Sequence, residues 1–199
     1  MYAHSWALCC LLTVTSFPAI AEHARVDVIL HNPEGTSDLA LSEMKLELNS
    51  LMERAGFEID WLGKEASSAI MKGDLVVVEL RGSCQPPSAS VSEPGVVRLG
   101  SSAVADGKVL PFSWVDCTAL AQLLEPYLTR VQKERRESVY GRAVARVLAH
   151  ELYHVLGHTL AHTASGLSKA RFEPNDLLDE RAEFELVAMA RLQTPGLLH

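Results

Sequence analysis

The sequence has little of what would mark several large classes of protein. It contains no internal repeat and no low-complexity tract, which excludes solenoid and fibrous architectures. Lysine and arginine (18 together) are outnumbered by aspartate and glutamate (25), and the net charge is -7. Proteins that bind nucleic acids usually carry an excess of basic residues on one face, so we expect no nucleic-acid partner. The chain also has no Asn-x-Ser/Thr glycosylation sequon.

Long hydrophobic runs are missing too, with one exception near the N-terminus. The apolar run Trp6–Phe17 is followed by the tripeptide Ala-Ile-Ala at 19–21, which is typical of a signal-peptide cleavage site. A membrane anchor is the alternative, but about 20 apolar residues are needed to span a bilayer, and this run is shorter. We therefore predict a signal peptide over residues 1–21, cleaved near Ala21. The mature chain, 22–199, is then secreted or periplasmic and has no membrane span.

The mature chain has the size and composition of one globular domain. Hydrophobic residues make up 48% of the sequence and charged residues 22%, which is an ordinary globular composition. A chain of 199 residues is too short for two comfortable hydrophobic cores. We expect a single domain over residues 22–199.

Cysteine is scarce after cleavage, when only Cys84 and Cys117 remain. Two cysteines in an exported chain predict one disulfide. Two free thiols and a metal-binding pair are the alternatives. The wide separation of the two cysteines, with no further Cys or His nearby, argues against a zinc ribbon.

The pattern of apolar residues predicts strands first and helices afterwards. Strands are expected over 25–31, 57–62, 74–80 and 108–117, and helices over 38–55, 118–137, 138–157 and 174–193. The continuous apolar run in 74–80 predicts a central strand. Pro111 predicts that the strand 108–117 lies at an edge, because proline cannot donate to a ladder. We therefore expect an α+β fold, in which a small twisted mixed sheet packs on the helix 138–157 and on further helices.

The helix 138–157 contains the pattern His-Glu-x-x-His. Residues four apart lie about 6 Å apart along a helix and on nearly the same face, so His150 and His154 can direct two imidazoles at one ion. Glu151 lies about 100° around the helix from His150, close enough to hold a water molecule at that ion. The neighbouring residues are uncharged, as a buried metal-binding helix requires. A surface helix with incidental histidines is the alternative, and we predict a Zn²⁺ site with Glu151 as general base.

The residues leave several candidates for a third metal ligand. His158 would lie about 12 Å from His150 along a continued helix, which is too far for both to bind one ion. His162 comes after a turn that leaves room for the chain to fold back. An acidic residue further along the chain is the other alternative, and the candidates are Glu173, Glu180 and Glu183.

The segment 150–172 resembles a group of small exported bacterial zincin-like proteins related to the metzincins. Their motif is His-Glu-x-x-His, seven residues, and then His-x-x-x-Gly. The residues that match it here are His150, Glu151, His154, His162 and Gly166. The resemblance implies a zincin-like fold, with His162 as the third zinc ligand. It also implies that the edge strand, around Val109 to Val115, lies over the cleft and binds an extended peptide by strand addition.

Other positions near the motif differ from the metzincin signature or are interpreted as structural. Gly157 stands where metzincins have the glycine that lets the chain turn, but Leu160 stands at their third histidine, and Leu167 stands where the relatives often have methionine. His158 is expected to interact with carbonyl groups at the helix end. Tyr153 is expected to pack beneath the motif, and Met189 is expected in the core of the last helix.

The favoured function is a secreted zinc metallopeptidase that acts on a peptide or protein substrate. Zn²⁺ is held by three histidines, and Glu151 moves the protons. A non-catalytic exported protein that binds zinc or a partner on a zincin-like scaffold is the alternative, and a closed site with Glu173 or Glu180 as fourth ligand would support it. An autoinhibited enzyme, with Cys84 bound to the metal as a free thiol, is a third hypothesis.

Overall fold

The computed structural model describes residues 23–63, 73–87 and 98–194, so the predicted signal peptide lies outside the described residues. The strands are β1 (Ala24–His31), β2 (Phe57–Leu62), β3 (Asp74–Arg81), β4 (Gly100–Ala105) and β5 (Lys108–Asp116). The α-helices are α1 (Asp38–Arg54), α2 (Cys117–Leu128), α3 (Arg136–Leu156), α4 (Pro174–Leu178) and α5 (Leu186–Gln193). There are also two short 3₁₀ helices. The first, η2 (Lys133–Arg135), directly precedes α3, and the second, η3 (Gly166–Ser168), lies between α3 and α4.

The strands form one mixed sheet, as predicted. Its order is β2-β1-β3-β5-β4, so β3 is the central strand that its continuous apolar run predicts. All neighbouring strands are parallel except β4, which runs antiparallel to β5. The alternating residues that face the helices are buried, and they include Val26, Val28, Val76 and Val78. Together with the helices, this mixed sheet confirms the α+β class.

The edge strand was predicted wrongly. Residues 108–116 form β5, which lies inside the sheet between β3 and β4, and the edge is β4. Pro111 is tolerated there because it lies where both ladders are interrupted. Pairing of β5 with β3 begins only at Phe112, and the register with β4 shifts between Ser102 and Val104. A proline at such an irregularity removes no ladder hydrogen bond.

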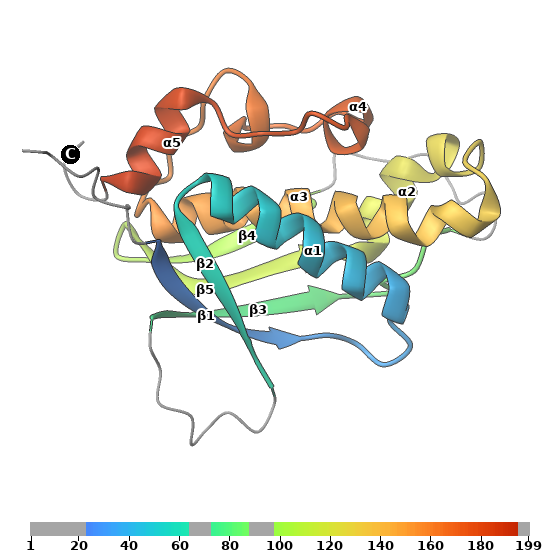
Figure 1. Ribbon diagram of the computed structural model, residues 1–199, viewed down its shortest axis with the longest axis horizontal. Helices are drawn as coiled ribbons and strands as arrows, with labels where there is room; N and C mark the ends of the chain where they lie inside the picture. The colour runs from blue at the N-terminus through green and yellow to red at the C-terminus, as the bar shows by residue number, and fades with distance from the viewer. Residues whose placement is uncertain (1–22, 64–72, 88–97, 195–199) are drawn as a thin grey trace, which may run out of the picture.

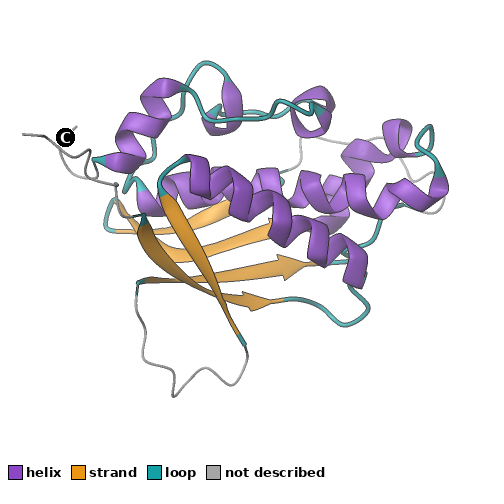
Figure 2. Ribbon diagram, viewed as in Figure 1, coloured by secondary structure: helices purple, strands orange, loops and turns teal. Residues whose placement is uncertain are grey.

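Helices α1 and α3 lie side by side over one face of the sheet (Figure 1), and the C-terminal segment with α4 and α5 lies beyond them (Figure 2). Close contact between the two helices depends on Gly141, where an added Cβ would lie 2.3 Å from the carbonyl oxygen of Ala40. From Tyr140 to Leu156, every residue of α3 except Arg142 is buried. A helix that is apolar on nearly all sides is expected at such an interior position.

Two predicted helices are interrupted in the structure. The segment 118–137 contains α2, which passes through Pro126 and ends at Leu128, and then a turn and η2. In that turn the Arg136 guanidinium donates to the carbonyl oxygens of Thr129 and Val131 at 3.0 Å, which satisfies backbone groups that a continuous helix would have paired. The segment 174–193 is divided into α4 and α5. The Asp179 side chain accepts a hydrogen bond from the Arg181 N–H (2.9 Å), a local bond that competes with the helical one.

Cys84 and Cys117 are joined by a disulfide, as predicted. The bond ties the segment after β3 to the first residue of α2. Since the Cys84 sulfur is bonded, it is not a free thiol that could bind a metal, and the autoinhibited arrangement is excluded. Among the described residues, no helix combines the length and the apolar character that crossing a membrane requires.

A buried ion pair holds α1, α3 and α4 together. The Arg146 guanidinium lies 2.9 Å from Oε1 of Glu47 on α1 and donates to the carbonyl oxygen of Leu177 on α4 at 2.8 Å. Arg146 is 3% exposed, so its charge depends on these partners in place of water. Because α3 carries the metal motif one turn further on, this contact also holds that helix in place.

We expect Arg146→Ala to lower the free energy of unfolding by about 3–5 kcal/mol, because it leaves the Glu47 carboxylate and a buried carbonyl without their partner. Urea denaturation of the metal-free protein measures this effect. Arg142→Ala on the same helix is the matched control and should change stability by less than about 1 kcal/mol. Equal effects of the two substitutions would show that the buried ion pair is not an important contact.

Candidate metal centre

The motif residues occupy the last two turns of α3. His150, Glu151 and His154 are all buried at its C-terminal end. The helix ends at Gly157, which has an ordinary right-handed φ of -82°. The turn itself is made by His158, with φ 45°. Gly157 is therefore needed for space and not for its backbone freedom, because an added Cβ would lie 2.7 Å from the carbonyl oxygen of Tyr153.

Each imidazole of α3 is fixed at one nitrogen by a backbone carbonyl. Nδ1 of His150 lies 2.8 Å from the oxygen of Leu167, and Nδ1 of His154 lies 2.8 Å from the oxygen of Thr159. A carbonyl oxygen can only accept a hydrogen bond, so both Nδ1 atoms carry a proton and donate it. In a neutral imidazole this leaves Nε2 with a lone pair, which is the form that binds a metal.

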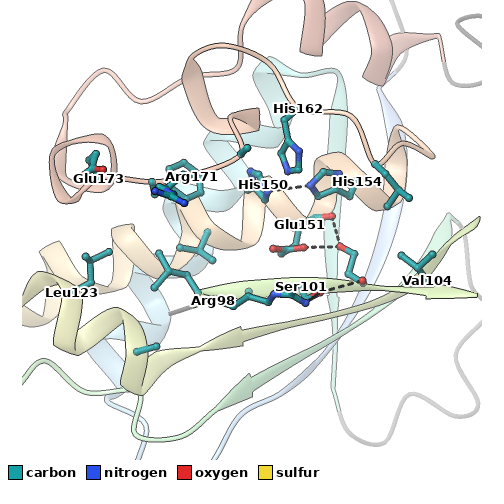
Figure 3. A pocket seen from close by; sticks show the side chains of 18 residues that line it. Arg98, Ser101, Val104, Leu123, His150, Glu151, His154, His162, Arg171 and Glu173 are labelled. Carbon is teal, nitrogen blue, oxygen red and sulfur yellow. Dashed lines mark hydrogen bonds between the residues drawn. The ribbon is translucent and has the colours of Figure 1, made fainter. Parts of the chain in front are cut away.

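The two Nε2 atoms face each other at 3.1 Å (Figure 3). With both Nδ1 atoms protonated, two neutral rings have no proton to share between these nitrogens, and their lone pairs repel each other. A cation between them removes the repulsion. Two nitrogens bound to one tetrahedral Zn²⁺ at 2.0–2.1 Å are about 3.3 Å apart, close to the spacing observed here. The donor set therefore fits a zinc ion.

His162 comes back from the loop after α3 to join this pair. Its ring centroid lies 5.3 Å from that of His150 and 4.8 Å from that of His154. One ligand nitrogen from each of the three histidines lies within 4.8 Å of the others, and Figure 3 shows the His162 ring directed at the pair. The three histidines named from the sequence are thus brought together at one point that could hold a metal ion.

The surroundings keep these rings neutral. Burial, followed by the neighbouring His154 and His162, lowers the pKa of His150 to about 4, although the bond to Leu167 acts in the opposite direction. Burial is also the main cause that lowers the pKa of His154 and of His162. Near neutral pH all three rings are therefore neutral and can bind a metal without first losing a proton.

The Glu151 carboxylate is held by the edge strand β4. Oγ of Ser102 lies 2.8 Å from Oε2 of Glu151 and 3.0 Å from Oγ of Ser113, the residue opposite it on β5. An ionised carboxylate only accepts, so Ser102 donates its proton to Oε2, with the Glu151 carbonyl oxygen as a second acceptor at 3.0 Å, and Ser113 in turn donates to Ser102. On the other side of the carboxylate, a Cβ at Gly100 would lie 2.9 Å from Oε1. Glycine at this position therefore leaves room for the second carboxylate oxygen.

The carboxyl group of Glu151 titrates close to neutrality in the metal-free protein. Burial raises its pKa to about 7, while the hydrogen bond from Ser102 and the charge of Arg98 act in the opposite direction. A cation bound at the histidines would lower this pKa, because an opposite charge favours the ionised form. A carboxyl group in this range can both accept and return a proton.

The histidines and Glu151 open into a cleft of about 790 Å³. One wall is β4 with the residues just before it, and the other is the segment 170–173 (Figure 3). The ring of Phe172 from this second wall meets the His150 ring edge-on, with centroids 5.3 Å apart. The cleft therefore runs along the free edge of β4 and across the three histidines.

The acidic alternatives for the third ligand lie elsewhere. Glu173 lines the cleft, but it is the residue before α4 and takes part in capping that helix. Glu180 and Glu183 are exposed and do not line the cleft. The group of potential ligands around His150 contains histidines alone.

The residues interpreted as structural lie outside the cleft. His158 is exposed at the end of α3, where its N–H bonds to the carbonyl oxygen of Val155. Tyr153 is fully buried, and its hydroxyl accepts a hydrogen bond of 2.7 Å from Arg191. Met189 packs against the core from α5, as expected. Sequence reasoning missed Ser102, Arg98 and Arg171 as cleft residues, because nothing near them in the sequence connects them with the motif.

No protein-family model and no curated protein matches the sequence. The chain is similar in structure to archaemetzincin from Methanopyrus kandleri, with 16% sequence identity and a TM-score of 0.49, over 89% of this chain and 97% of that chain. The function of individual residues therefore has to be inferred from the geometry of this chain.

We expect the zinc-loaded protein to contain one zinc per chain and His162→Ala to weaken zinc binding by more than about 100-fold. The loss of even an outer partner of a ligand lowers metal affinity by about 10–100-fold. Elemental analysis after dialysis and competition with a chelator measure both quantities. His158→Ala is the matched control and should bind zinc as the wild type does. Undiminished zinc binding in His162→Ala would contradict the three-histidine site.

Proposed function

We propose that this protein is an exported zinc-dependent metallopeptidase that hydrolyses peptide bonds. One observation carries the proposal most directly. Two imidazoles present their Nε2 atoms to each other at 3.1 Å, and the carboxylate of the residue between them in the sequence opens into the same cleft. A cation site and a proton-transfer group at one point of an open cleft are what metal-assisted hydrolysis needs.

His150, His154 and His162 would hold the ion. A bound zinc ion supplies Lewis acidity, which polarises a substrate carbonyl and makes water more acidic at neutral pH. The protein's part is to present three neutral rings in fixed tautomers. The carbonyl oxygens of Leu167 and Thr159 do this for two of them.

Glu151 is the proposed acid–base group. Its carboxylate takes a proton from the water that attacks the peptide carbonyl and later delivers a proton to the leaving amine. Ser102 holds Oε2 through a hydrogen bond of 2.8 Å, so that Oε1 remains for the reaction.

The substrate would bind along β4. Among the strands that the structure describes, β4 pairs with β5 alone, so its other edge offers N–H and C=O groups to an extended peptide. The cleft runs along this strand, and the Ser102 side chain on it touches Glu151. A peptide added to the edge of β4 would therefore pass directly in front of the carboxylate and the histidines.

Export is proposed from the N-terminal apolar run and agrees with the disulfide. Cys84 and Cys117 are paired, and disulfides persist in oxidising compartments outside the cytosol. The proposed mature enzyme is the single domain 22–199, which would act in the periplasm or outside the cell. Mass measurement of the secreted product would locate the proposed cleavage near Ala21.

A second candidate function is a non-catalytic exported protein that binds zinc or a partner on a zincin-like scaffold. The residues that favour it are Leu160 and Leu167, which stand where the metzincin signature has its third histidine and its methionine. The open cleft beside the histidines favours the enzyme instead, because structural zinc sites are closed by four protein ligands. The behaviour of a Glu151 variant separates the two functions.

We expect Glu151→Gln to lower kcat for peptide hydrolysis by at least about 100-fold, because the amide cannot accept the proton. Zinc content should stay at the wild-type level, since glutamine has nearly the same shape and Glu151 is not a proposed ligand. Hydrolysis of a fluorogenic peptide library and elemental analysis measure the two effects. Wild-type activity in the Gln variant would contradict the role of Glu151, and complete inactivity of the zinc-loaded wild type would favour the binding protein.

We expect Ser102→Ala to lower kcat by about tenfold with a smaller effect on KM, because the carboxylate loses the hydroxyl that fixes its orientation, worth about 1–2 kcal/mol. Ser102→Thr keeps a hydroxyl group and should recover most of the activity. Steady-state kinetics of the three proteins at equal zinc content makes the comparison. A change in KM alone would show that Ser102 contacts the substrate and does not position Glu151.

A further inference from the structure

Two arginine side chains line the cleft in a protein with a net charge of -7. Arg98 lies just before β4, and Arg171 belongs to the segment that forms the opposite wall. Among residues 23–63, 73–87 and 98–194, neither guanidinium forms an ion pair with a carboxylate. By contrast, the cations that do form one are Arg25, Arg81, Arg146 and Lys169. The cleft thus presents two guanidinium groups that form no ion pair, although the charge of Arg98 also acts on the Glu151 carboxyl group.

The Arg98 side chain lies close to the proposed point of cleavage. Nη1 of Arg98 is 3.4 Å from Oγ of Ser101, so the exposed side chain lies beside the first residues of β4 in the cleft that both residues line. Ser101 precedes Ser102, which holds Glu151, and neighbouring residues of a strand are about 3.3 Å apart along its axis. In Figure 3 the Arg98 guanidinium lies beside Ser101, below Glu151. A group on the peptide that meets this guanidinium must therefore be close to the scissile bond.

Arg171 lies across the cleft from β4. It precedes Phe172, whose ring lies against the His150 ring, so its position in the wall is fixed by a neighbour in contact with the metal site. In Figure 3 Arg171 lies on the Leu123 side of the histidines, whereas Val104 lies on the opposite side. Charged residues therefore gather towards the α2 end of the cleft, and the far end of β4 is apolar.

Glu173, the acidic residue next to Arg171 in the cleft wall, is engaged at the start of α4. It takes part in the capping box of that helix, where the Asp176 side chain accepts a hydrogen bond of 2.6 Å from the Glu173 N–H. Asp176 is itself paired with Lys169. Asp176 is thus used in local structure, and among the described residues no ion pair joins the exposed Glu173 carboxylate to Arg171.

The direction of a bound peptide follows from the geometry of β4, if the proposed function holds. A strand that adds to a free edge pairs slightly better in the antiparallel direction. A peptide running antiparallel to β4 passes from the Ala105 end to the Gly100 end, and so towards Arg98. Residues on the C-terminal side of the scissile bond then come between Arg98 and Arg171.

We propose that the cleft selects peptides that carry a carboxylate within the first two positions after the cleaved bond, bound by Arg98 and Arg171. Guanidinium groups pair with carboxylates through charge-assisted, often bidentate, hydrogen bonds. The carboxylate belongs to an aspartate or glutamate side chain or to the C-terminus of a short peptide. This inference rests on the proposed peptidase function and adds the class of substrate.

A matched peptide series tests the proposal on the zinc-loaded wild type. The peptides differ only in having Glu, Gln or Lys at the first or second position after the cleaved bond. We expect kcat/KM to be about five- to tenfold higher for Glu than for Gln, as for a partly exposed ion pair, and lowest for Lys. The preference should shrink as ionic strength rises from about 0.05 M to 0.5 M. Two further Gln peptides end at the second position after the cleaved bond, one with a free and one with an amidated C-terminus. Faster cleavage of the free form would show that the arginines also bind a terminal carboxylate.

Charge-reversal variants test whether the two arginines cause the preference for the Glu peptide. Arg171→Glu and Arg98→Glu should each reduce the preference for the Glu peptide, and Arg171→Glu should favour the Lys peptide. Arg181→Glu, an exposed arginine outside the cleft, makes the same change in net charge and should leave the preference unaltered. Binding of labelled, uncleaved peptides to the Glu151→Gln variant, followed by fluorescence anisotropy, should give the same order of affinity without turnover.

Each outcome separates this inference from the proposed function. Cleavage of the Glu, Gln and Lys peptides at equal rates would overturn the carboxylate selection and leave the peptidase function standing. A preference for carboxylates before the cleaved bond would overturn the antiparallel placement. If no peptide is cleaved, the peptidase function fails, and equal binding of labelled Glu and Lys peptides to the wild type would overturn the selection as well.

Discussion

The candidate site depends on two hydrogen bonds from imidazole Nδ1 atoms to backbone carbonyls. The bonds from His150 to Leu167 and from His154 to Thr159 decide which nitrogen of each ring carries the proton. They turn two Nε2 lone pairs towards each other at 3.1 Å, an arrangement that favours a cation. Without these bonds the same His-Glu-x-x-His segment would offer two imidazoles free to rotate and to change tautomer.

The carbonyl that holds His150 is itself held by the chain that follows. The Leu167 N–H donates to the carbonyl oxygen of Glu183 at 2.9 Å, next to Gly166 with its φ of 68°. A Cβ at Gly166 would lie 2.8 Å from that same carbonyl oxygen, so glycine is required for this close approach. The described segment after the motif helix therefore supports the candidate metal centre through backbone contacts, and His162 is the candidate ligand that it supplies.

The position of the Glu151 carboxylate depends on the other wall of the cleft. The hydroxyls of Ser113 and Ser102 lead from β5 through β4 to Glu151, so the edge of the sheet and the motif helix share one hydrogen-bond chain. An edge strand that lies beside a carboxylate can position it and also pair with an extended substrate. One strand can thus serve both roles, and the polypeptide needs no additional domain to form a cleft.

Part of the fold and of the candidate site could be predicted from the sequence, because these features depend on the spacing of residues close together in the chain. The pairing of His150 with His154 follows from the pitch of a helix, and the central position of β3 follows from its apolar run. The edge strand β4 could not be found in this way. Its sequence, Gly-Ser-Ser-Ala-Val-Ala, is rich in small residues with weak strand preference, and it becomes a strand by pairing with β5.

The contacts of Ser102 could not be predicted, because they join residues 49 positions apart through the folded sheet. The break between α4 and α5 was missed for a different reason. The side chain of Asp179 bonds to the backbone two residues on, and this local competition is stronger than the helical preference of the surrounding residues. His162 was named from a resemblance, and its approach to the other two rings follows the turn at His158, whose positive φ is uncommon outside glycine and is not signalled by the sequence.

The most direct test of the account is X-ray absorption spectroscopy of the zinc-loaded protein at neutral pH. The account predicts three imidazole nitrogens at about 2.0–2.1 Å and one further light atom that is not a protein ligand, with one imidazole lost in His162→Ala. A spectrum with a sulfur ligand, with fewer than three imidazoles, or with no change in His162→Ala would contradict it.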